Sequence, residues 1–262
     1  MQNWVETTIE NSVAHLRFVR GGSNALDPSY ITQINQALLS IVSNNALQAL
    51  VITSKGKAFS VGGDLSFFAA NLNTFTDDLD YAIRQLNEAI ELLAGLPIPV
   101  VVGIHGGVGG GSLGFLGVAD FVIAAPNTRF ATGYADIGLC SDGGNSWFLP
   151  HLVGMRRAKE LLLDNRSLDV DTALEWGLIN RIECIDNLEE ACLEKAQQMV
   201  ARSAYGLGQM KQLLTCSVGQ SLSAQLQAER QAMVSCAVQA NIKAKISVFS
   251  ALKNKQANKL IL

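Results

Sequence analysis

Two glycine-rich segments and one isolated carboxylate carry the chemistry that this sequence can support. The segments are residues 58–65 and 103–112, and the carboxylate is Asp142, within the glycine-containing segment 137–144. Each of the first two follows a short apolar run typical of a strand and precedes residues typical of a helix. Backbone N–H groups at such a turn have no helical partner and can donate to a negatively charged oxygen. Two donor segments and one base therefore predict the formation and stabilisation of an enolate.

Glycine suits both donor positions because it has no Cβ to obstruct a ligand and adopts turn conformations that other residues resist. We place the two donors at Gly63 and Gly111. Asp142 is the candidate base, although its Ser-Asp-Gly-Gly context is also typical of a turn, or of a cap on a helix beginning near residue 145. Asp136 is the nearest rival carboxylate. The residues alone leave a catalytic and a structural interpretation of Asp142 open.

Alternating strand-like and helix-like segments must position these loops. Strands are predicted at 13–19, 49–53, 99–104 and 120–124, and helices at 29–43 and 77–94. This order is that of βαβ units, in which crossover helices join parallel strands, and it predicts an α/β fold. Further helices are predicted at 158–163, 171–176, 189–201, 203–214 and 221–237. We expect a core over residues 1–200 that carries the site, and a helical region over 201–262 that packs on the core or on a neighbouring subunit.

The composition is that of a globular protein, since 262 residues with 48% hydrophobic side chains can fill a sizeable core. A net charge of −3 gives no broad electrostatic reason to bind nucleic acid or an anionic membrane. The sequence has neither a typical export signal nor the roughly 18 to 20 consecutive apolar residues of a membrane helix. Five cysteines, an odd number without metal-ligand spacing, are typical of reduced thiols. We expect a cytoplasmic protein without a metal site.

The order of the motifs along the chain resembles that of a known family. Residues 24–27, 58–65, 97–103, 130–150 and 173–179 together resemble the enoyl-CoA hydratase/isomerase (crotonase) superfamily. The resemblance covers nearly the whole chain. It implies a core built as a spiral of ββα turns, followed by a helical C-terminal region, and assembly as homotrimers or hexamers.

The same resemblance implies roles for particular residues. It places the two amides of an oxyanion hole at Gly63 and Gly111, around the oxygen of an acyl thioester. Coenzyme A enters as part of the substrate, with its adenine near the backbone of residues 60–65, and no separate cofactor is implied. The carrier could instead be an acyl-carrier protein. The predicted substrate-binding residues are Ser60, Val61, Gly63, Asp64, Leu65, Gly111 and Tyr134.

This chain also departs from the hydratases that it resembles. Those enzymes position and activate water with two glutamates, whose places here are taken by Gly114 and Tyr134, so we expect hydration to be slow or absent. Asp142 stands where enoyl-CoA isomerases, including ring-epoxide isomerases, carry a single acid. One carboxylate suffices to move a proton from C2 to C4 of a 3-enoyl thioester. We expect burial near Leu139, Trp147 and Phe148 to raise the pKa of Asp142.

Alternative functions stay open at this point. The segment around Asp142 also resembles 4-chlorobenzoyl-CoA dehalogenases, in which an aspartate attacks a ring carbon. A third interpretation is a protein that binds CoA thioesters without catalysis. His105, in the second donor segment, is either a second acid/base or a hydrogen-bonded structural histidine. The sequence does not identify the acyl chain.

Overall fold

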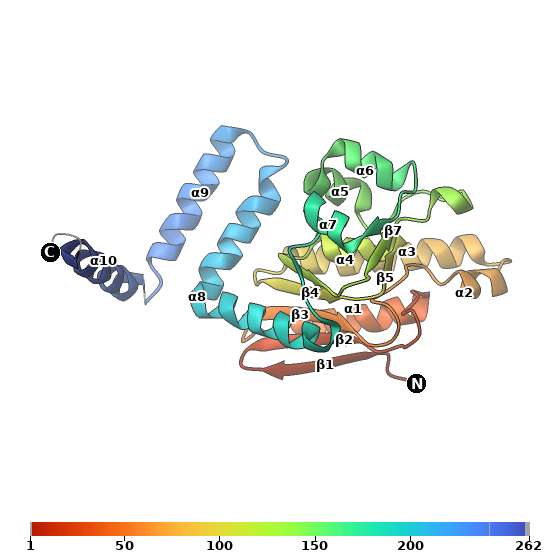
Figure 1. Ribbon diagram of the computed structural model, residues 1–262, viewed down its shortest axis with the longest axis horizontal. Helices are drawn as coiled ribbons and strands as arrows, with labels where there is room; N and C mark the ends of the chain where they lie inside the picture. The colour runs from red at the N-terminus through yellow and green to blue at the C-terminus, as the bar shows by residue number, and fades with distance from the viewer. Residues whose placement is uncertain (1, 241, 260–262) are drawn as a thin grey trace. The chain divides into compact units, whose positions relative to one another are not determined.

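The computed structural model describes residues 2–240 and 242–259 (Figure 1). The chain divides into two compact units, Met1–Ala204 and Tyr205–Leu262. Residues 241 and 260–262 of the predicted helical region lie outside the described residues. No helix in the described part of the chain is long and apolar enough to cross a membrane.

The first unit is built on two sheets. The larger has the strand order β1-β2-β3-β4-β6-β9, in which β1 is antiparallel to β2 and the other neighbours are parallel. The smaller has the order β5-β7-β8. The chain passes from β4 directly to β5, and from β6 to β7, so that successive strands enter different sheets, as in a spiral of ββα turns. The strand bounds are Val5–Glu10, Val13–Phe18, Ala49–Ser54, Val100–Ile104, Gly107–Gly109, Phe121–Ala124, Arg129–Ala131, Leu168–Asp169 and Arg181–Ile182 for β1 to β9.

Helices α1 (Pro28–Val42) and α3 (Phe75–Gly95) pack side by side and bury the main core against the sheet. Asp27 caps α1 by accepting a hydrogen bond of 2.8 Å from the Tyr30 N–H, and proline begins the helix where its missing N–H is harmless. The buried residues of α3 recur every three or four positions, as one face of a helix requires. They are Ala82, Leu86, Ala89, Ile90 and Leu93.

A second core lies on the opposite face of the large sheet. Alternate strand residues such as Val51 and Val101 point away from the main core, because successive side chains of a strand face opposite sides. The first part of α8 (Leu188–Ser217) covers them with Leu188, Ala191 and Cys192, among others. The sheet is therefore covered on both faces, as a mostly parallel sheet requires.

The other helices include short ones that follow the three glycine-rich segments. Helix α2 begins directly after the first glycine-rich segment, and α4 and α5 follow the second and third. Helix α8 contains a non-helical residue at Ser203 (φ −178°, ψ 103°), next to residue 202, where the sequence predicted a break between two helices. The C-terminal helical region is confirmed, with α9 and α10 following α8. The remaining bounds are Leu65–Ala70 for α2, Gly114–Gly117 for α4, Asn145–Val153 for α5, Met155–Leu162 for α6, Val170–Trp176 for α7, Leu222–Ala237 for α9 and Ile242–Lys259 for α10.

Candidate active site

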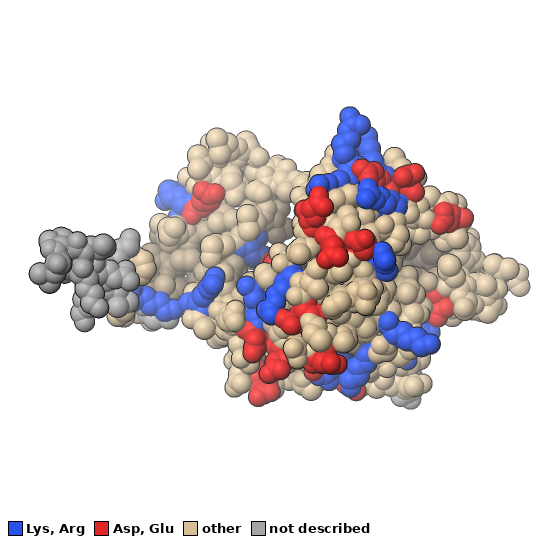
Figure 2. All heavy atoms as spheres, viewed as in Figure 1, with Lys and Arg blue, Asp and Glu red and all other residues tan. Residues whose placement is uncertain are grey.

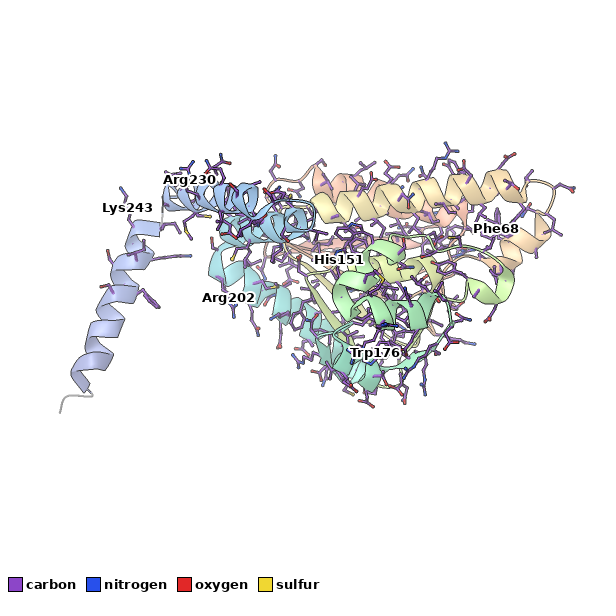
Figure 3. All side chains as sticks on the ribbon, turned by 90° about the horizontal axis from the view of Figure 1, so that it is seen from above. Phe68, His151, Trp176, Arg202, Arg230 and Lys243 are labelled. Carbon is purple, nitrogen blue, oxygen red and sulfur yellow. The ribbon has the colours of Figure 1, made fainter. Side chains whose placement is uncertain are left out.

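A cavity of about 390 Å³ brings together the residues that the sequence singled out. Gly63, Gly111, Tyr134 and Asp142 all line it. Phe68, which Figure 3 labels on α2, lines it as well. The rest of the lining is mainly apolar and comes from α2, α3 and the loops beside them: Val61, Leu65, Ala69, Leu72, Phe75, Leu79, Ile137 and Leu139.

The first glycine-rich segment pairs with Leu26 through bonds that do not use the Gly63 N–H. Leu26 pairs with this segment by donating to the Gly62 carbonyl oxygen at 2.7 Å and by accepting from the Asp64 N–H at 2.8 Å. The Gly63 N–H takes part in neither bond. Gly62 has φ 88°, and a Cβ there would lie 2.7 Å from the Gly109 carbonyl oxygen, so glycine is required where the two donor segments touch.

The other residues predicted to bind substrate in this segment have different surroundings. Ser60 is fully buried, and its carbonyl oxygen accepts from the Ser112 hydroxyl at 2.7 Å, which joins the two donor segments. Asp64 caps α2 by accepting from the Ser66 and Phe67 N–H groups. Val61 and Leu65 are exposed on the cavity wall. The contacts of these residues with a substrate remain a prediction.

Gly111, in the second donor segment, lies directly against Asp142. A Cβ at position 111 would stand 2.7 Å from Asp142 Oδ1 and 2.6 Å from Leu86 Cδ2, both too close for a real side chain. The missing side chain therefore lets the candidate base approach the backbone of the second donor segment. A carboxylate and two glycines line the same cavity, with Gly111 against the carboxylate, and this arrangement suits proton transfer beside a developing oxyanion.

Tyr134 contacts the Asp142 side chain, and Asn145 contacts Tyr134 in turn. The Tyr134 hydroxyl donates to Asp142 Oδ1 at 2.5 Å, and Asn145 Nδ2 donates to the Tyr134 hydroxyl oxygen at 3.0 Å. Asn145 Nδ2 also donates to the Gly110 carbonyl oxygen at 2.9 Å. The sequence did not indicate Asn145, because as the first residue of α5 it belongs to no motif. Its position directly after a Gly-Gly pair was the available signal.

Burial raises the pKa of Asp142, in the predicted direction, while the hydrogen bond from Tyr134 acts against that rise. Of the predicted neighbours, Leu139 lines the cavity, whereas Trp147 and Phe148 line neither of the two cavities beside Asp142. Leu86 of α3 lines the smaller of them together with Asp142. Among the described residues that line the cavity, Asp142 carries the only carboxyl group, and none is Lys, Arg or His. Burial and the nearby carboxylate also raise the pKa of Tyr134, which keeps its proton.

Gly114 and Tyr134, where the resemblance places the two hydratase glutamates, are both buried in the structure. A Cβ on Gly114 would overlap the carbonyl oxygen of Gly143, so no larger residue fits there without moving the backbone. Tyr134 fills the second position and points its hydroxyl at Asp142. The cavity therefore holds one carboxylate where the hydratase arrangement needs two.

The remaining candidates lie outside the cavity lining. Asp136 accepts a hydrogen bond from Asn165 Nδ2 at 2.5 Å, and His105 Nε2 lies 3.1 Å from the Gly56 carbonyl oxygen. These contacts support the structural interpretation of His105. No cluster of three potential metal ligands occurs among the described residues.

Comparison with known proteins gives a consistent result. Residues 8–257 match the family model described as enoyl-CoA hydratase/isomerase. The chain is 27% identical over 259 residues to 1,2-epoxyphenylacetyl-CoA isomerase of Escherichia coli strain K12, with 98% of each chain covered. It is 30% identical to 4-chlorobenzoyl coenzyme A dehalogenase-2 of an Arthrobacter species, over 77% of this chain and 74% of that protein. A putative enoyl-CoA hydratase/isomerase structure from Mycobacterium abscessus superposes with a TM-score of 0.88 and 30% identity, over 94% of this chain and 96% of that one.

The fold and the site therefore define a crotonase-type α/β protein with a helical C-terminal region. The chain belongs to the enoyl-CoA hydratase/isomerase family and is a crotonase-superfamily acyl-CoA enzyme. Its relatives include an isomerase and a dehalogenase, so family membership does not by itself identify the reaction. The reaction has to be inferred from the residues of the site.

Proposed function

We propose that this protein is an enoyl-CoA isomerase that shifts a double bond within an acyl-CoA thioester. The observation that carries the proposal is the single carboxylate of Asp142, set against Gly111 in a cavity that Gly63 also lines. Isomerisation needs one group that removes a proton and returns it elsewhere. Activating water in the hydratase manner needs a second acid, and the two hydratase positions are occupied by Gly114 and Tyr134.

The proposed reaction begins with Asp142 taking a proton from C2 of a 3-enoyl thioester. The electrons of the broken C–H bond spread over the double bond and the thioester carbonyl, giving a dienolate. Its oxygen accepts hydrogen bonds from the Gly63 and Gly111 N–H groups, which together form an oxyanion hole. Asp142, now protonated, gives the proton to C4, and the product is the conjugated 2-enoyl thioester. The base is regenerated, so no cofactor is consumed and coenzyme A enters only as part of the substrate.

The cavity supports an uncharged, apolar acyl group as the substrate. Its lining carries no Lys, Arg or His among the described residues, and Phe68, Phe75 and Leu79 offer apolar surface. An acyl group with a terminal charge would lose water there without gaining a partner of opposite charge. Homotrimeric or hexameric assembly and a cytoplasmic location remain predictions, and light scattering of the purified protein would check the first.

The test is to incubate the protein with 3-hexenoyl-CoA and follow the conjugated thioester by ultraviolet absorbance, with a 2-enoyl-CoA hydration assay in parallel. We expect conjugation without hydration, and a loss of at least roughly a hundredfold in Asp142→Asn, because general acid–base catalysis contributes on that scale. Asp136→Asn is the matched control, since this nearby carboxylate is bonded to Asn165 outside the cavity lining and should leave the rate unchanged. Hydration by the unmodified protein, or full activity in Asp142→Asn, would refute the proposal.

A second candidate is nucleophilic displacement by Asp142, favoured by the 30% identity to the Arthrobacter dehalogenase. The same Oδ1 atom that Tyr134 contacts, or Oδ2 beside it, would then form a bond to a ring carbon and chloride would leave. Chloride release from 4-chlorobenzoyl-CoA distinguishes the two reactions. A protein that only binds thioesters would give neither conjugated product nor chloride, and would keep its thioester affinity in Asp142→Asn.

A further inference from the structure

The cavity wall contains a chain of hydrogen bonds that the proposed reaction does not by itself require. It runs from the Gly110 carbonyl oxygen through Asn145 and Tyr134 to Asp142. Asn145 is 1% exposed and Tyr134 is 9% exposed, so water competes little for these bonds. The four residues belong to two segments that are distant in sequence, the second donor segment and the 134–145 loop.

The direction of every bond in this chain follows from what each group can donate. The Gly110 carbonyl oxygen can only accept, so Asn145 must present its Nδ2 amide nitrogen there. The same nitrogen has a second hydrogen, which goes to the Tyr134 oxygen. An ionised Asp142 carboxylate can only accept, so the single Tyr134 proton is directed at its Oδ1. With Asp142 ionised, the arrangement has no alternative polarity.

We propose that Tyr134 and Asn145 are positioning residues that fix the rotamer of the Asp142 carboxylate and leave Oδ2 as the oxygen that takes and returns the substrate proton. The catalytic role of Oδ2 in this inference rests on the proposed function. The effect of Tyr134 and Asn145 on the titration of the Asp142 carboxyl does not, and it can be measured without substrate. Asn145 holds the Gly110 carbonyl with the same amide, so it also fixes the base relative to the second donor segment, where Gly111 follows Gly110.

The hydrogen bond from the Tyr134 hydroxyl is the main side-chain interaction that lowers the pKa of Asp142. Residues packed nearby from α2 and α3 are apolar: Phe68, Leu79, Ala82, Ile83 and Leu86. From the second donor segment, Gly111 offers backbone only. No Lys, Arg, His, Glu or second Asp lines either cavity at this place among the described residues. Removing the Tyr134 hydroxyl should therefore raise the titration midpoint of Asp142, because no charged side chain nearby offsets the change.

The experiment is to titrate the Asp142 carboxyl by NMR in protein labelled with carbon-13 at the aspartate side chains, assigning the signal from its absence in Asp142→Asn. In Tyr134→Phe we expect the midpoint to rise by about one to two pH units, because a hydrogen bond to an ionised carboxylate is lost. Asn145→Ala should shift it in the same direction by a smaller amount, since the Tyr134 proton is then free to turn away. Tyr81→Phe is the control, as this half-exposed tyrosine of α3 should leave the midpoint unchanged.

Isomerase measurements on the same variants separate the two proposals. We expect the acid limb of kcat/KM to move with the NMR midpoint in Tyr134→Phe, while KM changes less than kcat. An unmoved midpoint in both Tyr134→Phe and Asn145→Ala would overturn the positioning role, whatever the activity. A shifted midpoint in a protein without isomerase activity would support the hydrogen-bond chain and refute the proposed function. If Tyr134→Phe fails to fold, the midpoint in Asn145→Ala decides.

Discussion

The backbone of Gly143 packs so closely on Gly114 that a Cβ on Gly114 would overlap the Gly143 carbonyl oxygen. Gly143 directly follows Asp142, so this contact places the candidate base beside helix α4, just after the second donor segment. Gly114, where the resemblance to hydratases predicts a glutamate, is thus a packing contact between two backbones in this structure.

Replacing Gly114 should therefore damage the fold instead of restoring hydration. We expect Gly114→Ala to lower stability by about 1–3 kcal/mol, the usual cost of overpacking a closed site, and Gly114→Glu to lower it further. Thermal unfolding measures this effect. Gly95→Ala is the matched control, because a Cβ at the end of α3 meets no atom within 4 Å. A stable Gly114→Glu variant that hydrates 2-enoyl-CoA would contradict the packing argument.

Asp142 should reduce the stability of the protein at neutral pH. Its pKa is raised in the folded protein, so the folded state holds the proton more tightly than the unfolded state does. Any stability from this linkage is present below the unfolded pKa and is lost as the pH rises through the folded pKa. Asp142→Asn should consequently melt at a higher temperature than the unmodified protein at pH 7, with a smaller difference at low pH. Equal melting temperatures at pH 7 would argue against the buried charge.

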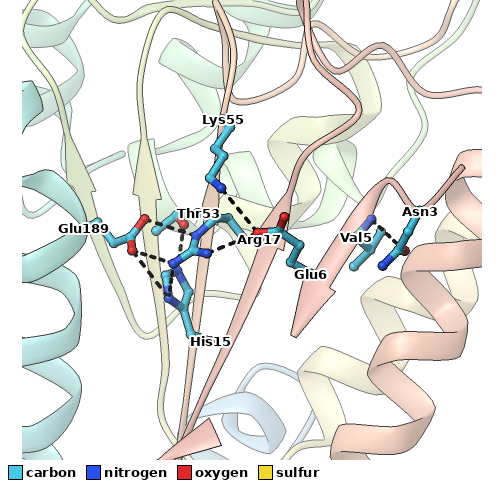
Figure 4. A network of polar contacts seen from close by, with 8 residues as sticks. All are labelled: Asn3, Val5, Glu6, His15, Arg17, Thr53, Lys55 and Glu189. Carbon is cyan, nitrogen blue, oxygen red and sulfur yellow. Dashed lines mark hydrogen bonds and ion pairs between the residues drawn. The ribbon is translucent and has the colours of Figure 1, made fainter. Parts of the chain in front are cut away.

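His15 predicts a second dependence of stability on pH. This histidine is 4% exposed between β2 and α8, where its Nε2 lies 2.7 Å from Thr53 Oγ1 and Arg17 lies 3.3 Å from its Nδ1 (Figure 4). Arginine can only donate, so Nδ1 accepts and the ring is neutral. Burial first, and the Arg17 charge next, lower the pKa of His15 to about 4, while Glu189 and Glu6 act in the opposite direction.

Because the folded pKa of His15 lies below the ordinary value of 6.5, stability should fall as the pH drops from 6.5 to about 4, while only the unfolded state takes up the proton. The loss is at most about 3 kcal/mol. Denaturant unfolding at several pH values measures it. His15→Gln should flatten the dependence, whereas the exposed His151→Gln should not. The same slope in both variants would assign the effect to other groups.

The apolar cavity predicts a preference for longer acyl chains. Each buried methylene contributes about 0.8 kcal/mol, so kcat/KM should rise roughly tenfold for every two carbons until the chain fills the space. A series of 3-enoyl-CoA substrates from six to ten carbons measures this trend. A substrate with a terminal carboxylate should react much more slowly, since the described lining offers no cation. Indifference to chain length would place the acyl group outside this cavity.

Much of the fold follows from local sequence patterns. The strands predicted at 13–19 and 49–53 are present as Val13–Phe18 and Ala49–Ser54, and the helix predicted at 29–43 is Pro28–Val42. Their apolar periodicity is strong because they face a core. The sequence patterns do not predict β1, because most of its side chains are exposed. They do not predict β9 either, because it has two residues and pairs with β6 only in the folded chain.

The site was predictable only where a residue type carries its own signal. The glycine segments and Asp142 stand out by composition. Asn145 does not, because its value comes from two partners, Gly110 and Tyr134, that reach it only after folding. The lining beside Asp142 also depends on tertiary structure: Leu86 of α3, distant in sequence, lines a cavity together with Asp142, whereas Trp147 does not.

Basic and acidic side chains are interspersed over the face drawn in Figure 2. This distribution matches the expectation, drawn from the net charge, that the protein has no broad electrostatic reason to bind nucleic acid. Cation–π contacts use some of the basic groups locally. Arg157 and Arg166 each lie 4.9 Å from the Trp176 ring centroid, and Figure 3 labels this tryptophan.

The second core contains its own chemical reporter. Cys192 is fully buried in α8 against the sheet, and burial raises the pKa of its thiol to about 12, whereas Cys140, Cys184 and Cys216 are exposed and Cys236 is half-buried. An alkylating reagent should consume the other thiols first and reach Cys192 only when the start of α8 leaves the sheet. The rate of that last modification would give the opening free energy of one face of the protein, without any introduced label.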